Sequence, residues 1–261
     1  MVLEAKKNIV VVGYPKSGTT WVTRLVADIV GCPVEGYWGY DGTAMVSEGA
    51  DRDSEYVCYQ SHHHYEELPN KDRIHMLICV IRHPGDILIS GAEHFRFGFK
   101  NLENTFLALG ISKRWYWYSL RLLNQIFPQT YRQKRMLNAL MYGDESVSTW
   151  CKYSWSKFMA SYDESDHLTA VYAYLLRNPM EFCHEVLEFL GLEINRSSLA
   201  DVIQRQSFSA RKAEFKSKSD VKQVHFLRAG KSGGWKKELS KQQLLLLQAL
   251  VSDFESRLAG I

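Results

Sequence analysis

Residues 8–21 read NIVVVGYPKSGTTW, and this stretch decides the fold class. Its first part, Asn8–Gly13, is a β-branched apolar run that ends at a glycine, which is typical of a buried parallel strand. From Thr19 to Val30 the apolar residues recur at the spacing of a helix, and Gly31 ends that pattern. The stretch therefore predicts a strand, a loop and a helix in that order.

The same order of elements recurs along the chain. Two more strands are predicted at Glu55–Gln60 and His75–Ile81. A fourth strand is predicted at Leu168–Leu175, followed by helices over Met180–Leu190 and from Ser240 to about Leu258. This alternation predicts an α/β fold with a mainly parallel central sheet flanked by helices, which begins with a P-loop-like strand–loop–helix. We expect a single domain over residues 1–261.

The composition excludes several other classes of protein. The chain has 261 residues, 46% hydrophobic and 23% charged, which fits a folded core and not a disordered or collagen-like chain. Its longest near-apolar run, Leu244–Val251, is far shorter than the roughly 20 residues that span a bilayer, and no signal peptide is recognisable. The net charge of +3 is too small to argue for nucleic acid, and the five cysteines form no CxxC pair. We expect a cytoplasmic protein with reduced thiols and with neither a membrane nor a nucleic-acid partner.

The loop between Gly13 and Gly18 has the composition of a phosphate-binding loop. Backbone N–H groups at the start of a helix bind anions, and the helix dipole adds to the attraction. The glycine spacing equals that of a Walker A loop, but that loop needs a lysine directly after its second glycine, where this chain has Thr19. The lysine lies instead within the loop, at Lys16, from where it would reach the bridging oxygen of a shorter phosphate ester.

Three segments of the chain together resemble a known family. Residues 14–21 (YPKSGTTW) resemble the 5′-phosphosulfate loop of sulfotransferases that use 3′-phosphoadenosine 5′-phosphosulfate (PAPS). Residues 82–90 (RHPGDILIS) are similar to the family's 3′-phosphate segment R-x-x-x-D-x-x-x-S. Residues 228–236 (RAGKSGGWK) resemble its RKGxxGDWK loop, although Ala229 and Gly234 replace a lysine and an aspartate. The order of the segments identifies the chain as a member of the cytosolic-type small-molecule sulfotransferases, over roughly the first 95 and the last 110 residues.

The resemblance implies a donor, a product and a set of cofactor-binding residues. The donor is PAPS, the product is 3′-phosphoadenosine 5′-phosphate (PAP), and no metal is required. Trp21 and Phe208 resemble the two aromatics that sandwich adenine, and Tyr172 matches the tyrosine that bonds an adenine nitrogen. The implied cofactor-binding residues are Lys16, Ser17, Gly18, Thr19, Thr20, Trp21, Arg82, Ser90, Tyr172, Ser207, Phe208, Arg228, Ala229 and Gly230.

Three consecutive histidines, His62 to His64, follow the second predicted strand. Adjacent residues of an extended chain point to opposite faces, and no cysteine stands at zinc spacing, so a metal site is not favoured. Gln60-Ser61-His62 resembles the family's K-[ST]-H, whose histidine accepts the proton of the acceptor hydroxyl. The resemblance therefore makes His62 the general base and Lys16 the cation at the leaving phosphate oxygen. Gln60 stands where the family often has a lysine.

The predicted function is the transfer of a sulfuryl group from PAPS to a hydroxyl of a small-molecule acceptor by in-line displacement. An alternative is a P-loop phosphotransferase, such as a small-molecule or nucleotide kinase, which the displaced lysine argues against. Another is a catalytically silent nucleotide- or nucleic-acid-binding module, favoured only by the basic stretch from Arg205 to Lys241. The sequence leaves the acceptor and the oligomeric state open.

Residues 95–150 match no segment of the family and are rich in aromatic side chains. Two interpretations stay open for them: a packed helical layer, or a site or lid for the acceptor.

Overall fold

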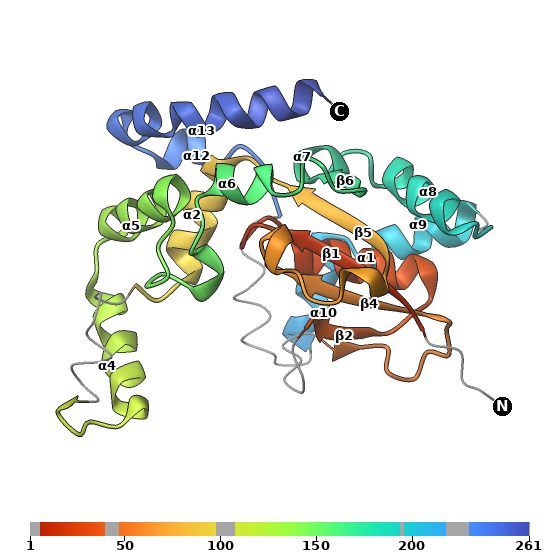
Figure 1. Ribbon diagram of the computed structural model, residues 1–261, viewed down its shortest axis with the longest axis horizontal. Helices are drawn as coiled ribbons and strands as arrows, with labels where there is room; N and C mark the ends of the chain where they lie inside the picture. Colours follow the sequence, from red (N-terminus) through yellow and green to blue (C-terminus); the bar gives the residue numbers. More distant parts are fainter. Residues whose placement is uncertain (1–5, 40–46, 98–107, 194–195, 218–229, 261) are drawn as a thin grey trace. The chain divides into compact units, whose positions relative to one another are not determined.

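The strands of this computed structural model form one six-stranded sheet in the order β3-β2-β4-β1-β5-β6 (Figure 1). All neighbouring strands are parallel except β2 and β3, which pair antiparallel. The strands are β1 (Lys7–Gly13), β2 (Val34–Tyr37), β3 (Ser47–Glu48), β4 (Tyr56–Ser61), β5 (Ile74–Ile81) and β6 (Leu168–Val171). The predicted α/β fold with a mainly parallel sheet is therefore confirmed.

The structure describes residues 6–39, 47–97, 108–193, 196–217 and 230–260. The chain divides into two compact units. The first comprises Met1–Arg82 and Ser161–Ser232 and holds the sheet, and the second comprises His83–Ala160 and Gly233–Ile261. The expectation of a single domain over the whole chain stays a prediction.

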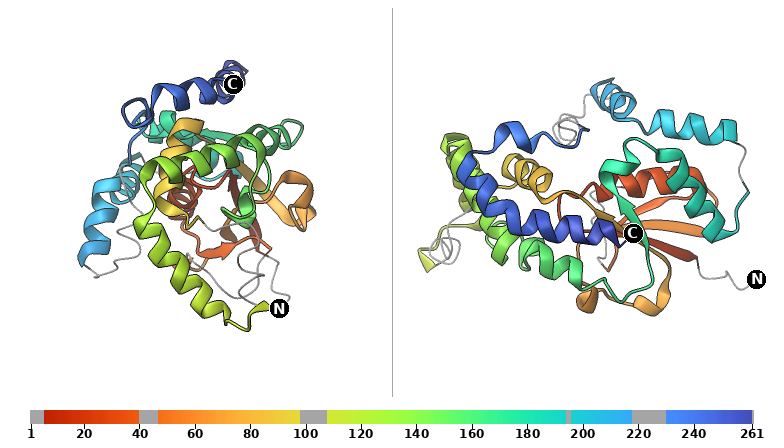
Figure 2. Two further views of the ribbon diagram at one scale, coloured as in Figure 1. Left: turned by 90° about the vertical axis from the view of Figure 1, so that its left-hand side faces the viewer. Right: turned by 90° about the horizontal axis from the view of Figure 1, so that it is seen from above.

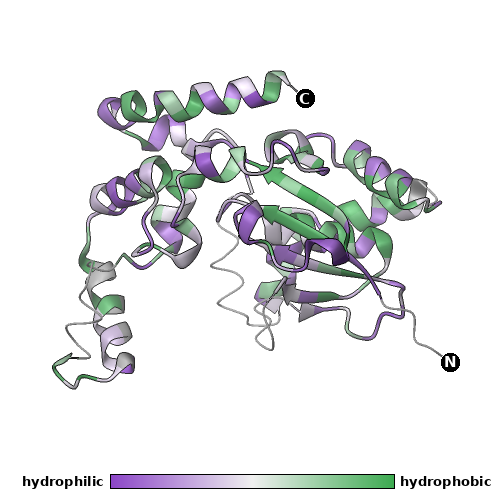
Figure 3. Ribbon diagram, in the orientation of Figure 1, coloured by the Kyte–Doolittle hydropathy of each residue, from purple (hydrophilic) through white to green (hydrophobic). Residues whose placement is uncertain are grey.

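Strand β1 lies in the middle of the sheet between β4 and β5. Its residues from Ile9 to Val12 are fully buried, as expected for a parallel strand covered on both faces. Figure 3 colours most of the central strands as hydrophobic. In the register of the sheet, Val12 pairs with Ser61 of β4, and Gly13 pairs with Val80 of β5. The carboxyl ends of these three strands therefore lie level, and the segments that follow them emerge at one edge.

The first unit also contains helices (Figure 2), several of which pack buried apolar side chains against the sheet. They are α1 (Thr19–Val30), α7 (Tyr172–Leu175), α8 (Pro179–Leu190), α9 (Arg196–Arg205) and α10 (Phe208–Ser217), with short 3-10 turns η1 (Tyr65–Glu67) and η2 (Lys71–Arg73). Helix α1 ends as predicted at Gly31, whose φ of 70° suits glycine and whose N–H binds the carbonyl oxygen of Ala27. Buried side chains of α1, α8 and α9 form one core with those of β1, β4 and β5.

The second unit contains helices only among its described residues. These are α2 (Pro84–His94), α4 (Lys113–Ile126), α5 (Gln129–Tyr142), η3 (Thr149–Cys151), α6 (Trp155–Ala160), α12 (Trp235–Glu238) and α13 (Lys241–Ala259). The buried carboxylate of Asp86 accepts the backbone N–H of Gly233 at 2.9 and 3.1 Å, which holds the start of α12 against α2. The ring of His83 stacks on Trp235 at 4.4 Å between centroids.

Two details of the predicted elements are wrong. The strand predicted over Leu168–Leu175 ends at Val171, because the chain turns helical at Tyr172, whose carbonyl oxygen accepts the N–H of Leu176. A short apolar run of this kind has no periodicity that separates strand from helix. The short strands β2 and β3 were not predicted, since neither shows a period-2 pattern long enough to recognise. Within the described residues, no helix has the length and apolar character needed to cross a membrane.

Candidate active site

The loop between β1 and α1 has two residues with left-handed backbone. Lys16 has a φ of 74° and Gly18 a φ of 101°, and the tight turn is closed by the N–H of Ser17 on the carbonyl oxygen of Tyr14 at 3.0 Å. Ser17 is fully buried, and its Oγ has no hydrogen-bond partner among the described residues. A buried hydroxyl at a helix N-terminus is a group that an anionic oxygen would complete.

Gly18 packs so closely against the ring of Tyr172 that its position has no space for a side chain. A Cβ at Gly18 would lie 2.5 Å from Cε2 of Tyr172, a distance that no side chain tolerates. The ring of Tyr172 also packs edge-on against Trp21, with 5.7 Å between the ring centroids. The guanidinium of Arg82 lies 4.4 Å from the centroid of the Tyr172 ring. The structure therefore brings together four residues that the resemblance selected from distant parts of the sequence.

Arg82 directly follows β5 and is bound to the phosphate loop. One of its terminal nitrogens donates to the carbonyl oxygen of Lys16 at 2.8 Å. Its Nε is buried and has no partner among the described residues. The guanidinium is thus held in place and retains a donor for an anion.

His62 directly follows β4, and its ring is anchored to the same loop. Its Nδ1 lies 2.7 Å from the carbonyl oxygen of Gly13. A carbonyl oxygen only accepts, so Nδ1 carries the hydrogen and the neutral ring has its lone pair on Nε2. Burial lowers the pKa of His62 to about 4; the bond to Gly13 opposes this shift, and the charges of Lys16 and His63 add to it. His62 is therefore a neutral base at pH 7.

The two neighbouring histidines have different surroundings. Nδ1 of His63 lies 2.9 Å from Oγ of Ser61, and its backbone carbonyl accepts the hydroxyl of Tyr162 at 2.7 Å. His64 is buried, and its Nδ1 lies 4.0 Å from the carboxylate of Glu66. His62 is thus the histidine that is hydrogen-bonded to the phosphate loop, and its role as a base stays a prediction. In the described part of the chain, no group of three or more His, Cys, Asp or Glu side chains is placed to hold a metal ion.

Lys16 has a pKa shifted towards neutrality. Burial, and secondarily the positive charge of Arg82, lower the pKa of its ammonium group to about 7. An anion bound between Lys16 and Arg82 would remove part of this repulsion and raise the pKa again.

Gln60, the residue that departs from the family pattern, is buried at the end of β4. Its Oε1 accepts the hydroxyl of Thr20 at 2.9 Å. A neutral amide thus contacts the first turn of α1 directly, and Thr20 is hydrogen-bonded to the strand that His62 directly follows. Thr19, the other threonine of this turn, is also buried.

The last predicted site residues of the first unit lie where α9 meets α10. The carbonyl oxygen of Gln206 accepts the ring N–H of Trp21 at 2.9 Å, and Ser207 and Phe208 follow directly. The ring of Phe208 lies 2.3 Å from the point where a Cβ on Gly230 would be, so the glycine permits this close approach. The bond between Trp21 and Gln206 could not be predicted, because a backbone carbonyl acceptor requires no particular residue type.

Three other predicted site residues remain: Ser90, Arg228 and Ala229. Ser90 lies half-buried on α2, in the second unit. Arg228 and Ala229 lie outside the described residues.

A family model described as the sulfotransferase domain matches residues 31–258. The chain belongs to the sulfotransferase family. The matched range begins after the phosphate loop, so this identification does not depend on the sequence of residues 14–21. Family membership supports sulfuryl transfer and does not favour the kinase interpretation.

Several solved structures share the fold. A mouse sulfotransferase in complex with PAP is 20% identical, with a TM-score of 0.66 over 95% of this chain and 84% of that one. Retinol dehydratase with androsterone and PAP is 13% identical, with a TM-score of 0.61 over 95% and 80%. Retinol dehydratase with retinol and PAP is 14% identical, with a TM-score of 0.59 over 94% and 80%. No curated protein sequence matches the chain.

Proposed function

We propose that this sulfotransferase transfers the sulfuryl group of PAPS to a hydroxyl of a small-molecule acceptor, with His62 as the general base. The bond of 2.7 Å between Nδ1 of His62 and the carbonyl oxygen of Gly13 carries the proposal. It ties the base to the loop that would hold the transferred group, and it fixes the tautomer whose Nε2 accepts a proton.

The residues present fit such a nucleotide. PAPS, when bound, supplies the activated sulfuryl group and leaves as PAP. The buried hydroxyl of Ser17 and the buried Nε of Arg82 have no partners among the described residues, and both suit anionic oxygens. Thr19, Thr20 and Gly18 complete the loop, while Trp21, Tyr172, Ser207, Phe208 and Gly230 would contact the adenosine. Ser90, Arg228 and Ala229 remain proposed on the resemblance alone.

Two side chains would act during the transfer. Nε2 of His62 takes the proton from the acceptor hydroxyl, because the low pKa leaves the ring neutral at pH 7. Lys16 neutralises the charge that develops on the leaving 5′-phosphate oxygen. The pKa of Lys16 is lowered to about 7, so its ammonium group would be only partly protonated at neutral pH without a bound anion. The bound phosphate would raise this pKa and keep the group charged.

We propose small hydroxylated molecules of lipophilic character as acceptors, and residues 95–150 as the acceptor site or lid. Helix α4 of this region has apolar side chains exposed at Trp115, Tyr118, Leu122 and Ile126. Their spacing places them along one side of the helix. Retinol dehydratase, which shares the fold, is solved with retinol and with androsterone.

The test is turnover of the purified protein with PAPS and a panel of phenols, hydroxysteroids and long-chain alcohols, followed by mass spectrometry. We expect a sulfated product and an equal amount of PAP. Phosphorylated product formed with ATP and Mg²⁺ would instead establish the kinase. Tight PAP binding without turnover of any acceptor would favour the catalytically silent nucleotide-binding module.

A further inference from the structure

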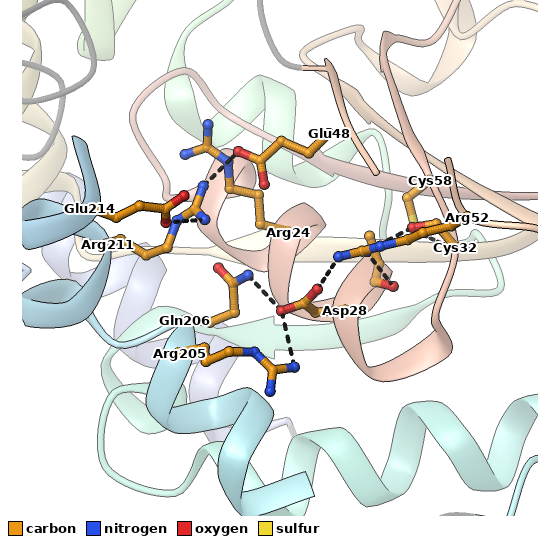
Figure 4. Close-up of polar contacts among 11 residues, drawn as sticks. Arg24, Asp28, Cys32, Glu48, Arg52, Cys58, Arg205, Gln206, Arg211 and Glu214 are labelled. Atoms are coloured by element: carbon orange, nitrogen blue, oxygen red, sulfur yellow. Dashed lines mark hydrogen bonds and ion pairs between the residues drawn. The ribbon is translucent and has the colours of Figure 1, made fainter. Parts of the chain in front are cut away.

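The junction between α9 and α10 is fastened to α1 by two carboxylates, Asp28 and Glu48 (Figure 4). Asp28 lies near the end of α1 and accepts the side-chain amide of Gln206 at 2.9 Å. A terminal nitrogen of Arg205 lies 3.8 Å from the same carboxylate oxygen. The other oxygen of Asp28 pairs with Arg52.

Glu48 of β3 makes the second attachment. One of its oxygens lies 2.7 Å from Nε of Arg24 on α1 and 2.6 Å from a terminal nitrogen of Arg211 on α10. Arg211 also pairs with Glu214 at 2.7 Å. The side chains of Arg24 and Arg211 are 5% and 11% exposed, so these charges are largely removed from water and depend on their partners.

Gln206 makes the attachment to Asp28 and also contacts Trp21. Its Nε2 donates to Asp28, and its carbonyl oxygen accepts the ring N–H of Trp21. Its Oε1 is buried without a partner among the described residues, so within that set only Asp28 orients the amide. The next two residues are Ser207 and Phe208. One helix, α1, therefore begins at the phosphate loop and also fixes the segment that would contact the nucleoside.

We propose that Asp28 and Glu48, with their partners Gln206 and Arg211, form a clamp that positions Ser207 and Phe208 for the nucleotide. None of these four residues is among the predicted cofactor-binding residues, and the inference rests on the proposed function. Breaking one attachment lets the junction adopt orientations that do not bind, so that the affinity for PAP falls. Turnover at saturating PAPS is preserved, because the attachments on α1 are made at Arg24 and Asp28, further along the chain than the loop that carries Lys16.

Two substitutions test the clamp from the α9–α10 side and leave α1 unchanged. In Gln206→Leu, Asp28 keeps its pair with Arg52, and in Arg211→Leu, Glu48 keeps its pair with Arg24. Titration calorimetry with PAP should show an affinity about tenfold lower for each variant. The KM for PAPS should rise by a similar factor while kcat stays within about twofold of wild type.

Matched variants separate positioning from general stability. Arg257→Leu removes an ion pair of 3.0 Å to Asp253 on α13, from a side chain of similar exposure (17%), and should leave PAP affinity unchanged. Arg211→Lys keeps the charge beside Glu48 and should restore most of the affinity. A lower melting temperature of Gln206→Leu and Arg211→Leu with unchanged PAP affinity would overturn the proposal, because the contacts would then be merely structural.

Hydrogen exchange on the wild type gives a readout that does not depend on folding of the variants. PAP should slow exchange of the backbone amides from Gln206 to Arg211, and unchanged exchange there would also overturn the clamp. If wild type binds no PAP at all, the proposed function fails together with the clamp. If it binds PAP but the variants bind equally well, only the clamp fails.

Discussion

The carboxyl edge of β4, β1 and β5 and the helix α4 differ in how their side chains are held. At the edge, His62 and Arg82 bind backbone carbonyl oxygens of the phosphate loop at 2.7 and 2.8 Å. On α4, Trp115 is 63% exposed and Ile126 is 76% exposed. The side chains at the edge are held in place by hydrogen bonds within the chain, whereas the side chains of α4 expose apolar surface to solvent.

The difference separates two kinds of recognition. Directional groups at the edge suit an anion of fixed geometry and a reaction with developing charge. Apolar area is non-directional and accepts molecules of varied shape. Substitutions at the edge should therefore change turnover or donor affinity strongly, while those on α4 should change only the use of acceptors.

The largest effect is expected from His62→Ala. The variant loses the group that takes the acceptor proton, so kcat should fall by about a hundredfold or more. PAP affinity, measured by calorimetry, should stay nearly unchanged, because in the proposed function the side chain contacts the acceptor and the transferred group and not the nucleotide. An ionised acceptor such as a nitrophenolate should be less sensitive to the loss.

Its neighbours provide the controls. His63→Ala and His64→Ala should each stay within a few-fold of wild type, because their rings bind elsewhere. The proposed reaction needs neutral His62, so kcat/KM should fall as the pH drops through about 4, the pKa of His62, and not near the usual 6.5. Loss of activity in His64→Ala with an active His62→Ala would show that the base is misplaced.

Lys16→Met should have the next largest effect, a fall in kcat of about a hundredfold. Methionine has a side chain of similar length and is as unfavourable as lysine at a φ of 74°. The substitution should therefore leave the strain of the loop backbone unchanged. PAP affinity should change less than kcat, because the charge that Lys16 meets grows towards the transition state. Weak binding with normal turnover would make Lys16 a ground-state anchor only.

The lowered pKa of Lys16 gives a second measurement on the same residue. At pH 8 a lysine with a pKa of about 7 is mostly neutral, and a bound anion raises the pKa. Wild type should therefore take up protons on binding PAP at pH 8, measured by calorimetry in buffers of different ionisation enthalpy. Lys16→Met should lose this uptake.

A smaller effect is expected from Arg82→Ala. The affinity for PAP should fall about tenfold, since a charge-assisted bond is worth about 1.5–3 kcal/mol. Adenosine 5′-phosphosulfate, which lacks the 3′-phosphate, should lose much less affinity. Arg73→Ala, at an exposed arginine before the same strand, serves as the control. Equal losses for both nucleotides would contradict the assignment of Arg82 to the 3′-phosphate.

Much of the edge could be predicted because its residues belong to short segments with fixed backbone geometry. Gly18 and Lys16 are set by one turn between a strand and a helix, and a level register then brings His62 and Arg82 beside them. A buried parallel strand and a helix that ends at glycine are both visible as local patterns.

Contacts between distant segments could not be predicted from the sequence. The bond from Trp21 to the carbonyl oxygen of Gln206 joins residues 185 positions apart and needs no particular side chain at its acceptor. The turn at Tyr172 is decided by tertiary packing, because an apolar run of that length is compatible with strand and helix. The contacts of helix α4 could not be predicted either. Its aromatic residues are evident in the sequence, but their spacing does not indicate what they contact.

The smallest effect is expected on α4, from Trp115→Ser. If the apolar side of this helix contacts a lipophilic acceptor, the loss of one exposed ring should raise the KM for a hydroxysteroid a few-fold, since aromatic burial contributes roughly 1.5–3 kcal/mol when complete and less here. The KM for a small polar alcohol, the affinity for PAP and kcat at saturation should stay at wild-type values, because the edge is untouched. Leu245→Ser, which removes an equally exposed apolar side chain (69%) from α13, is the matched control. Equal changes in both variants would mean that exposed apolar area as such affects the assay. A fall in PAP affinity for Trp115→Ser alone would mean that α4 contributes to the donor side, and the separation of the two regions would then break down.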